Sequence, residues 1–276
     1  MHCAANHAAS AGRDRSRFAP SKAAWLIACV WILGPSGAAQ KNPLATAASD
    51  PFIAAIATIK HSVGSMDCLA VSGSEAKILR RLASAFLISQ EADFLTAAHV
   101  VTAMQQNGDP CPTPAITLVE GDWRPDVPIE AMLWFPFIIE DCKVDDTIDV
   151  AECRPSGDWP ARIRKLHKAT PVQLEWSLQP DGTELAFTGF PLKARDPMTF
   201  LAHVAAYETP WPDQATPQTV LDHAGLPGFS GSPVFLANGK VIAIQVKDGS
   251  PDAPGTSIAR PSSAFRKLLE GRVQKE

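Results

Sequence analysis

The sequence predicts an all-β protein in which short strands are separated by turns. Its 276 residues include 24 prolines spread along the chain, which favours strands and loops over long helices. Asn238-Gly239, which lies between two apolar runs, is a strong signal for a β-hairpin turn. An apolar fraction of 46% and a charged fraction of 20% are ordinary for a globular chain. The net charge of −4 gives no indication of a nucleic-acid partner, so we expect none.

The first 39 residues have the three-part pattern of a secretory signal peptide. Basic residues between Arg13 and Lys22 precede an apolar run, Ala23–Leu33, and a small-residue segment that ends at Ala39. We therefore expect cleavage near Ala39 and a secreted or periplasmic mature chain with no stable membrane span. The alternative is an uncleaved signal that anchors the protein, although the apolar run is short for a membrane-spanning helix.

Most of the remaining chain predicts strands. We interpret Ile53–Ile59 as the first strand, because it is a short apolar run at the start of the part of the chain that predicts β structure. Further strands are expected at residues 83–89, 94–98, 115–120, 129–134, 148–153, 183–187, 199–207, 219–222, 234–236 and 240–246, and 255–259 form another that leads into the last helix. A short helical turn is expected after His99. The amphipathic tail Ser262–Leu269 predicts a C-terminal helix with Ser262 or Ser263 as its N-cap.

Four cysteines remain once the signal peptide is removed. No Cys-x-x-Cys pair occurs, so the spacing typical of zinc sites is absent, and we expect neither a metal nor a cofactor. Four cysteines in an exported protein indicate two disulfides. A Cys142–Cys153 bridge would bracket Asp149 and leave Cys68 with Cys111, while free thiols and the other two pairings stay open.

The segment Gly228–Pro233 has the composition of a sharp turn that exposes a hydroxyl. Glycines flank Ser230, and they allow the backbone angles and the close approach that such a turn needs. Acyl transfer requires a nucleophilic oxygen of this kind beside N–H groups that bind an oxyanion. Glycine, serine and proline also fill ordinary turns, so this segment alone is a weak signal.

Two other segments supply the groups that would activate a serine. His99 closes the strand-like run that begins at Phe94, and Asp149 precedes Val150-Ala151. In this order and spacing the three segments resemble the trypsin/chymotrypsin-like serine peptidases, especially the bacterial secreted types known as high-temperature-requirement proteases and glutamyl endopeptidases. The resemblance covers residues from about 52 to 270.

The resemblance implies a fold, a domain division and a set of roles. It implies two six-stranded antiparallel β-barrels with a C-terminal helix, the first in residues 40–157 with His99 and Asp149, and the second in 158–276 with Ser230. His99 would act as general base and then general acid, and Asp149 would orient the imidazole. The backbone N–H groups of Gly228 and Ser230 would form the oxyanion hole. Asp145 or Asp146 could serve as the acid instead of Asp149.

Three residues bear on activation and on specificity when the sequence is compared with the family pattern. Phe229 stands where trypsin-type zymogens carry an aspartate, so we expect activity that does not depend on a newly cut N-terminus. Ala224 corresponds to the floor of the specificity pocket, and Gln245 stands where glutamyl endopeptidases are expected to carry a histidine. Both are neutral, which argues against a basic or an acidic residue at P1, the substrate residue before the cleaved bond.

The sequence thus predicts a serine endopeptidase, expected to be monomeric, that acts on protein or peptide substrates. The alternative is a catalytically silent homologue that binds peptides or partner proteins.

Overall fold

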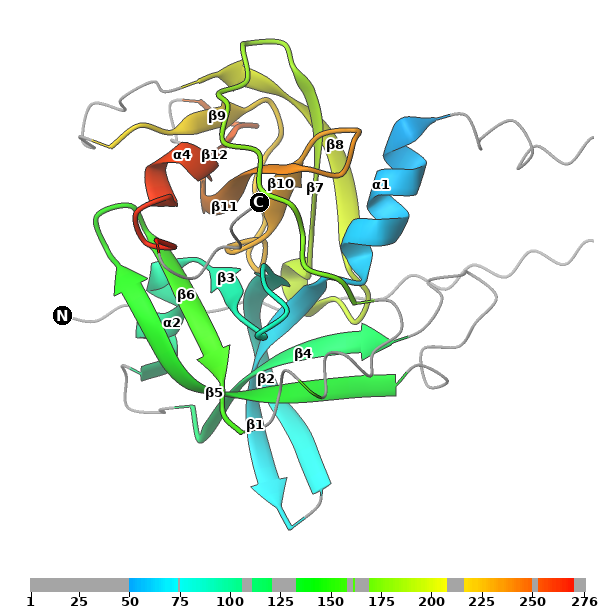
Figure 1. The fold of residues 1–276 in the computed structure, drawn as a ribbon, viewed down its shortest axis with the longest axis vertical. Coiled ribbons are helices and arrows are strands. Elements are labelled where there is room, and N and C mark those ends of the chain that lie inside the picture. The colour runs from blue at the N-terminus through cyan, green and yellow to red at the C-terminus, as the bar shows by residue number, and fades with distance from the viewer. Residues whose placement is uncertain are drawn as a thin grey trace, which may run out of the picture. The chain divides into compact units, whose positions relative to one another are not determined.

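The computed structural model describes residues 50–73, 75–105, 111–120, 133–157, 161, 169–207, 216–249 and 253–270. The predicted signal peptide and the start of the strand expected at 129–134 lie outside these ranges. The described strands form two six-stranded antiparallel sheets, and each sheet closes on itself as a barrel (Figure 1).

The first barrel contains β1–β6 in the order β1-β2-β3-β6-β5-β4. Its strands are β1 (Val63–Ser72), β2 (Glu75–Leu87), β3 (Phe94–Thr96), β4 (Thr113–Glu120), β5 (Leu133–Asp145) and β6 (Val150–Pro155). Helix α2 (Ala98–Gln105) begins two residues after β3 and confirms the expected helical turn. Because β3 pairs with β6 through Thr96 and Ala151, the segments that follow β3 and precede β6 lie side by side.

The second barrel contains β7–β12 in the order β10-β11-β12-β9-β8-β7. Its strands are β7 (Glu184–Gly189), β8 (Met198–Ala206), β9 (Thr219–Leu221), β10 (Pro233–Phe235), β11 (Val241–Asp248) and β12 (Ser257–Pro261). The Asn238-Gly239 turn joins β10 to β11, as its sequence predicts, with Gly239 at φ +79°. A single 3-10 turn, η4 (Pro191–Lys193), follows β7.

The C-terminal helix is shorter than predicted, and its cap differs. Helix α4 (Ser262–Phe265) has Pro261 at the N-cap with no side-chain cap bond, so neither Ser262 nor Ser263 caps it. Its predicted apolar face is nevertheless buried, at Phe265 and at Leu268 and Leu269 in the turns that follow.

The prediction of a strand at Ile53–Ile59 is wrong, because this segment is the helix α1 (Pro51–Lys60). The Asp50 carboxylate accepts a hydrogen bond of 2.8 Å from the Phe52 N–H, and Pro51 occupies the first turn, which is the usual start of a helix. Phe52, Ala55 and Ile59 are buried on one face of this helix. Strand β1 was not predicted, and it opens the first barrel instead.

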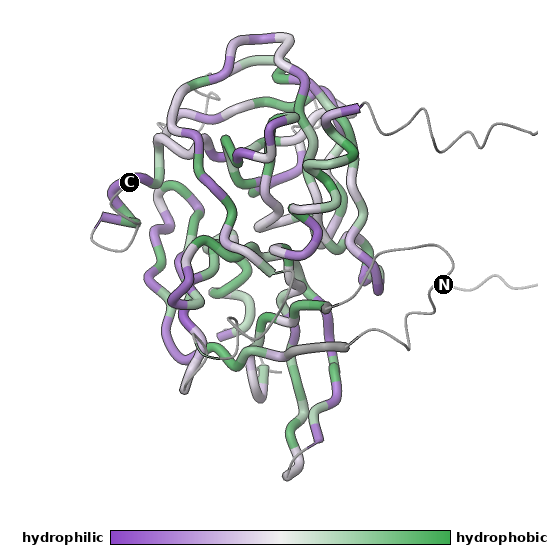
Figure 2. The backbone as a smooth tube through the Cα atoms, turned by 45° about the vertical axis from the view of Figure 1, so that its right-hand side comes forward, coloured by the Kyte–Doolittle hydropathy of each residue, from purple (hydrophilic) through white to green (hydrophobic). Residues whose placement is uncertain are grey.

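Most strands of the barrels are buried in continuous runs and do not alternate between buried and exposed residues. Strands β9, β10 and β12 are buried throughout, whereas β1 and β2 become exposed toward the turn that joins them. In Figure 2 this hairpin projects at the bottom and carries both hydrophobic and hydrophilic residues. Phe86, Phe94 and Phe137 are fully buried among the apolar residues of the first barrel, and Phe187 and Phe229 among those of the second. Within the described ranges, no helix combines the length and the apolar character needed to cross a membrane.

Two disulfides link the four cysteines of the predicted mature chain. Cys68 pairs with Cys111 at a Cα–Cα separation of 5.2 Å, and Cys142 pairs with Cys153 at 4.1 Å. The second bridge joins opposite residues of β5 and β6 and so closes the hairpin whose turn carries Asp149. Disulfides of this kind persist in oxidising compartments.

Candidate active site

The three residues singled out in the sequence come from three separate loops. His99 lies in the first turn of α2, directly after β3, and Asp149 ends the turn between β5 and β6. Ser230 lies in the loop from β9 to β10, in the second barrel. The β3–β6 pairing explains why the first two residues are neighbours, although 50 positions separate them in the chain.

A continuous chain of hydrogen bonds joins the three side chains. His99 Nδ1 lies 2.9 Å from Asp149 Oδ2, and His99 Nε2 lies 3.0 Å from Ser230 Oγ. The backbone N–H of His99 also donates to Asp149 Oδ1 at 2.9 Å. A carboxylate can only accept hydrogen bonds, so the tautomer that satisfies both contacts has its proton on Nδ1 and leaves Nε2 free to accept the one on Ser230. This is the arrangement that makes a serine oxygen nucleophilic.

The alternative acids occupy other positions in the same turn. Asp145 Oδ1 accepts the backbone N–H of Thr147 at 3.0 Å and that of Ile148 at 3.4 Å, so Asp145 shapes the turn. Asp149 has the left-handed backbone angle φ +55°, which is uncommon for a residue other than glycine. The carboxylate that reaches the imidazole is therefore held by a turn under backbone strain.

Ser84 of β2 attaches the Ser230 loop to the first barrel. Its N–H donates to Ser230 O at 2.9 Å, and its hydroxyl donates to Gly228 O at 2.8 Å and accepts the N–H of Phe190 at 2.9 Å. A Cβ on Gly231, at φ +86°, would collide with the Ser84 carbonyl oxygen, so only glycine allows this close approach. Backbone and side chain of one buried serine thus fix the position of Ser230.

The backbone N–H groups of Gly228 and Ser230 have no acceptor among the residues that the structure describes. The carbonyl of the Pro227–Gly228 peptide accepts the Leu192 N–H at 2.7 Å. Since the C=O and N–H of a trans peptide point in opposite directions, this bond directs the Gly228 N–H away from Leu192. Two unengaged donors on one turn are what an oxyanion site requires.

Phe229, the residue between these two donors, is fully buried. Its ring packs edge-to-face against Phe187 and Phe200, with centroid distances of 5.0 and 5.4 Å. The His223 ring packs edge-on against Phe187 and at a tilt against Phe200, with centroid distances of 5.3 and 4.7 Å. Aromatic packing around Phe229 therefore holds the turn that carries Ser230 against the core of the second barrel.

The two predicted specificity residues lie close to each other. Gln245 is buried, and its Nε2 is 2.9 Å from where a Cβ on Gly225 would lie, next to Ala224. Gln245 Oε1 has no hydrogen-bond partner within the described part of the chain. The exposed carboxylate of Asp248 also lies against Gly225, a proximity that the sequence did not indicate.

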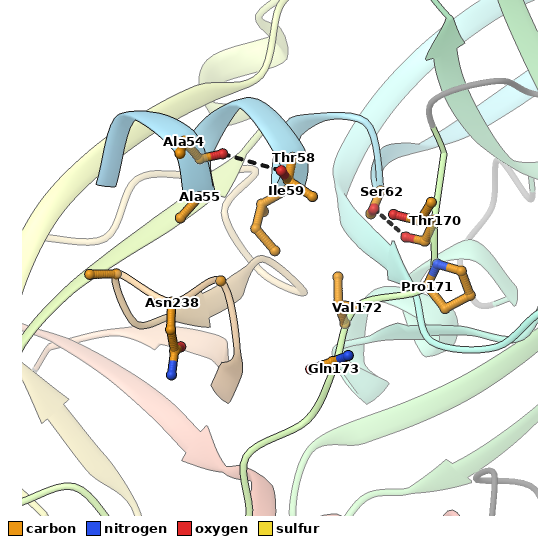
Figure 3. Close-up of a pocket in the computed structure, with 12 residues that line it drawn as sticks. Ala54, Ala55, Thr58, Ile59, Ser62, Thr170, Pro171, Val172, Gln173 and Asn238 are labelled. Carbon is orange, nitrogen blue, oxygen red and sulfur yellow. Dashed lines mark hydrogen bonds between the residues drawn. The ribbon is translucent and has the colours of Figure 1, made fainter. Parts of the chain in front are cut away.

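The residues that the structure describes hold no candidate metal cluster, and a cavity lies away from His99, Asp149 and Ser230. The described ranges contain no group of three or more His, Cys, Asp or Glu side chains that could hold a metal ion. A cavity of about 500 Å³ lies elsewhere, between α1, the segment Thr170–Gln173 and the Asn238-Gly239 turn (Figure 3). None of the residues that line it carries an acidic or a basic side chain.

Three further residues contact the site without a signal in the sequence. Ser84 acts through its backbone N–H and its hydroxyl, Leu192 acts through its backbone N–H, and Arg260 of β12 reaches the turn of Asp149. A buried arginine in an apolar strand is unusual, and it is the one feature that could have drawn attention in advance.

Comparison with known proteins gives a sequence match and several matches of fold. The sequence model of the trypsin-like peptidase domain matches residues 83–244. No curated protein matches in sequence. Among solved structures, the Rv3671c protease from M. tuberculosis in its active form is 18% identical with a TM-score of 0.55, and the match covers 89% of this chain and 96% of that one. The HtrA-type protease AlgW with a decapeptide is 16% identical with a TM-score of 0.59, and the match covers 79% of this chain and 66% of that one.

Proposed function

This chain belongs to the trypsin-like peptidase family, and from that premise we propose that it is a serine endopeptidase in which Ser230, His99 and Asp149 form the catalytic triad. The observation that carries the proposal is the hydrogen-bond chain from Asp149 through His99 to Ser230, with separations of 2.9 and 3.0 Å. The geometry lies within the range expected of a nucleophile, its base and the group that orients the base.

The proposed reaction has two halves. His99 Nε2 removes the Ser230 proton while Oγ attacks the carbonyl carbon of the scissile peptide bond, and the resulting oxyanion is bound by the N–H groups of Gly228 and Ser230. The imidazolium then gives its proton to the leaving amine, and an acyl-enzyme remains. Water, deprotonated by the same imidazole, attacks the ester carbonyl. The C–Oγ bond then breaks, the imidazolium returns its proton to Ser230 Oγ, and the acid product leaves. Asp149 stays ionised and stabilises the imidazolium in both halves.

The enzyme is proposed to be active without cleavage of its N-terminus. Phe229 has no charge that could pair with a freed amine, and it is buried among aromatic rings. The Leu192 N–H holds the Pro227 carbonyl at 2.7 Å and so keeps the Gly228 N–H directed toward the proposed oxyanion site. Both features support an oxyanion hole that needs no separate activation step.

The proposed P1 residue is uncharged. Ala224 and the buried Gln245 present neutral groups beside Gly225, so a charged P1 side chain would be buried without an ionic partner at the floor. The Asp248 carboxylate repels an acidic P1 residue. Because Asp248 is exposed, its attraction for a basic one is worth about 0–1 kcal/mol, too little to offset burial of that charge.

We further propose protein or peptide substrates and a secreted or periplasmic location. The two disulfides support an oxidising compartment. The predicted cleavage near Ala39 is tested by N-terminal sequencing of the protein purified from its native host.

The test of function is labelling with a fluorophosphonate, which reacts only with an activated serine. Wild type and Ser263→Ala, which removes an exposed serine on α4, should both be labelled, and Ser230→Ala should not. A folded wild type that remains unlabelled would refute the enzyme and favour a silent peptide-binding homologue. Profiling of the labelled enzyme on a peptide library then tests the P1 proposal, which a basic or acidic consensus would refute.

A further inference from the structure

We propose that Arg260 is a positioning residue that holds the Asp149 carboxylate in line with His99. The inference rests on the proposed function, because it assigns to Arg260 an effect that passes through the triad. Within the described ranges no hydrogen bond joins Arg260 to His99 or Ser230. Arg260 also lies outside the three sequence motifs that carry the family resemblance.

Arg260 reaches from the second barrel to the turn of the first. It lies on β12 and is 3% exposed. Its Nε donates to Ile148 O at 2.7 Å, and its Nη1 donates to Pro217 O at 2.7 Å and to Thr216 O at 3.3 Å. One planar guanidinium therefore fixes the Asp149 turn and the segment before β9 at the same time.

The carbonyl that Arg260 holds belongs to the peptide bond directly before Asp149. Asp149 has φ +55°, so its backbone is in a conformation that persists only when surrounding contacts determine it. A hydrogen bond from a charged donor is about twice as strong as a neutral one. The Arg260–Ile148 bond therefore opposes the rotation that would relax this backbone and carry the carboxylate away from His99.

The charge of Arg260 also acts on Asp149. Burial lowers the pKa of the Arg260 guanidinium from its ordinary value, and the Asp149 carboxylate acts in the opposite direction. An arginine nonetheless remains charged in a protein. Within the described ranges its hydrogen-bond acceptors are all backbone carbonyls, so the guanidinium holds the chain around Asp149 and is not itself bonded to a carboxylate.

The test compares Arg260→Lys and Arg260→Gln with wild type, using kcat per labelled site and KM on a peptide substrate. Lysine keeps the charge but loses the planar fork, and glutamine keeps one donor but loses the charge. We expect kcat to fall about 10- to 100-fold in each, the effect of a small displacement of a catalytic group. KM should stay within about twofold, because Arg260 lies away from the proposed P1 residues.

A double-mutant cycle with Asp149→Asn separates positioning from general stability. If Arg260 acts through Asp149, Arg260→Lys should lower kcat by less than about threefold when Asp149 is already replaced. Full additivity would overturn the proposal, and so would variants that fold and keep wild-type kcat. Variants too unfolded to assay would assign Arg260 a purely structural role and also overturn it.

Thr216→Val provides the matched control. Its hydroxyl donates to Thr147 O at 3.1 Å, so it also connects the second barrel to this turn, but two residues away from Asp149. We expect kcat to change less than about threefold. An unlabelled wild type would instead refute the proposed function, and that outcome is distinct from labelled wild type with unaffected Arg260 variants.

Discussion

The sharpest test of the oxyanion site is the substitution Gly228→Ala. Gly228 has φ +102°, where other residues are strained by about 1–3 kcal/mol. A Cβ there would collide with the Phe190 carbonyl oxygen and lie 3.1 Å from Pro191 Cα. The Pro227–Gly228 peptide must rotate to relieve this, which breaks its bond with the Leu192 N–H and moves the Gly228 N–H out of line.

Loss of one oxyanion donor lowers kcat by about 10²–10³-fold, or about 2.7–4 kcal/mol of transition-state stabilisation. We expect this fall in kcat for Gly228→Ala, with KM within about threefold, because the interaction forms mainly in the transition state. The assay is steady-state hydrolysis of a peptide substrate chosen by library profiling. Absorbance gives the total enzyme concentration, and the thermal unfolding curve verifies that the enzyme is folded at the assay temperature.

Gly182→Ala is the control for backbone strain alone. Gly182 has φ +81°, but no atom lies within 4 Å of its added Cβ. This variant should lose stability and keep kcat. A Gly228→Ala enzyme that folds and retains kcat within threefold of wild type would refute the assignment of the Gly228 N–H as an oxyanion donor.

Two further predictions concern stability. Ser84→Ala leaves the partly buried Gly228 O and the buried Phe190 N–H without this partner, so we expect the free energy of unfolding to fall by about 2 kcal/mol in urea titration, whereas a loss below about 0.5 kcal/mol would contradict this role. Asp222 is partly desolvated, yet hydrogen bonds from His203 hold its pKa below the ordinary 3.8. The stability that the Asp222 carboxylate contributes is therefore present above pH 3.8 and is lost as the pH falls through the lowered pKa. Asp222→Asn should be less stable than wild type near neutral pH by at most about 1 kcal/mol, because the carboxylate is largely exposed. This difference in stability should close below pH 3.8. A constant difference between melting curves across this range would show that the carboxylate charge is not responsible.

The sequence predicted those parts of the fold whose signals are local. Asn238-Gly239 specifies its own turn, and the short runs at residues 183–187 and 199–207 indicate the strands β7 and β8. The run Ile53–Ile59 was misassigned because a short apolar run fits a helix and a strand equally, and the Asp50-Pro51 start was the deciding signal.

Strand β1 was missed because its buried residues are partly polar. Ser65 and Asp67 are fully buried, and Asp67 is paired with Arg81 of β2 at 3.0 Å and bonded to Ser65 at 2.8 Å. Arg81 lies 14 residues after Asp67 and neutralises its buried carboxylate, which allows this segment to form a core strand. No pattern within residues 63–72 indicates that pairing.

The candidate site divides in the same way. His99, Asp149 and Ser230 lie in short motifs that local composition identifies. The contacts of Ser84 with Gly228 and of Arg260 with Ile148 span 144 and 112 positions, so they exist only once both barrels are folded. One sequence without its structure cannot reveal such pairs.

The bond from Ser84 to Ser230 has a consequence for biosynthesis. The oxygen that would attack a substrate and the imidazole that would activate it are brought together by strands from opposite halves of the chain. A nascent chain that contains only the first barrel would carry His99 without Ser230, and a fragment with only the second barrel would carry Ser230 without His99. An incomplete chain would therefore lack the proposed catalytic triad and would be unable to hydrolyse other proteins in the cell.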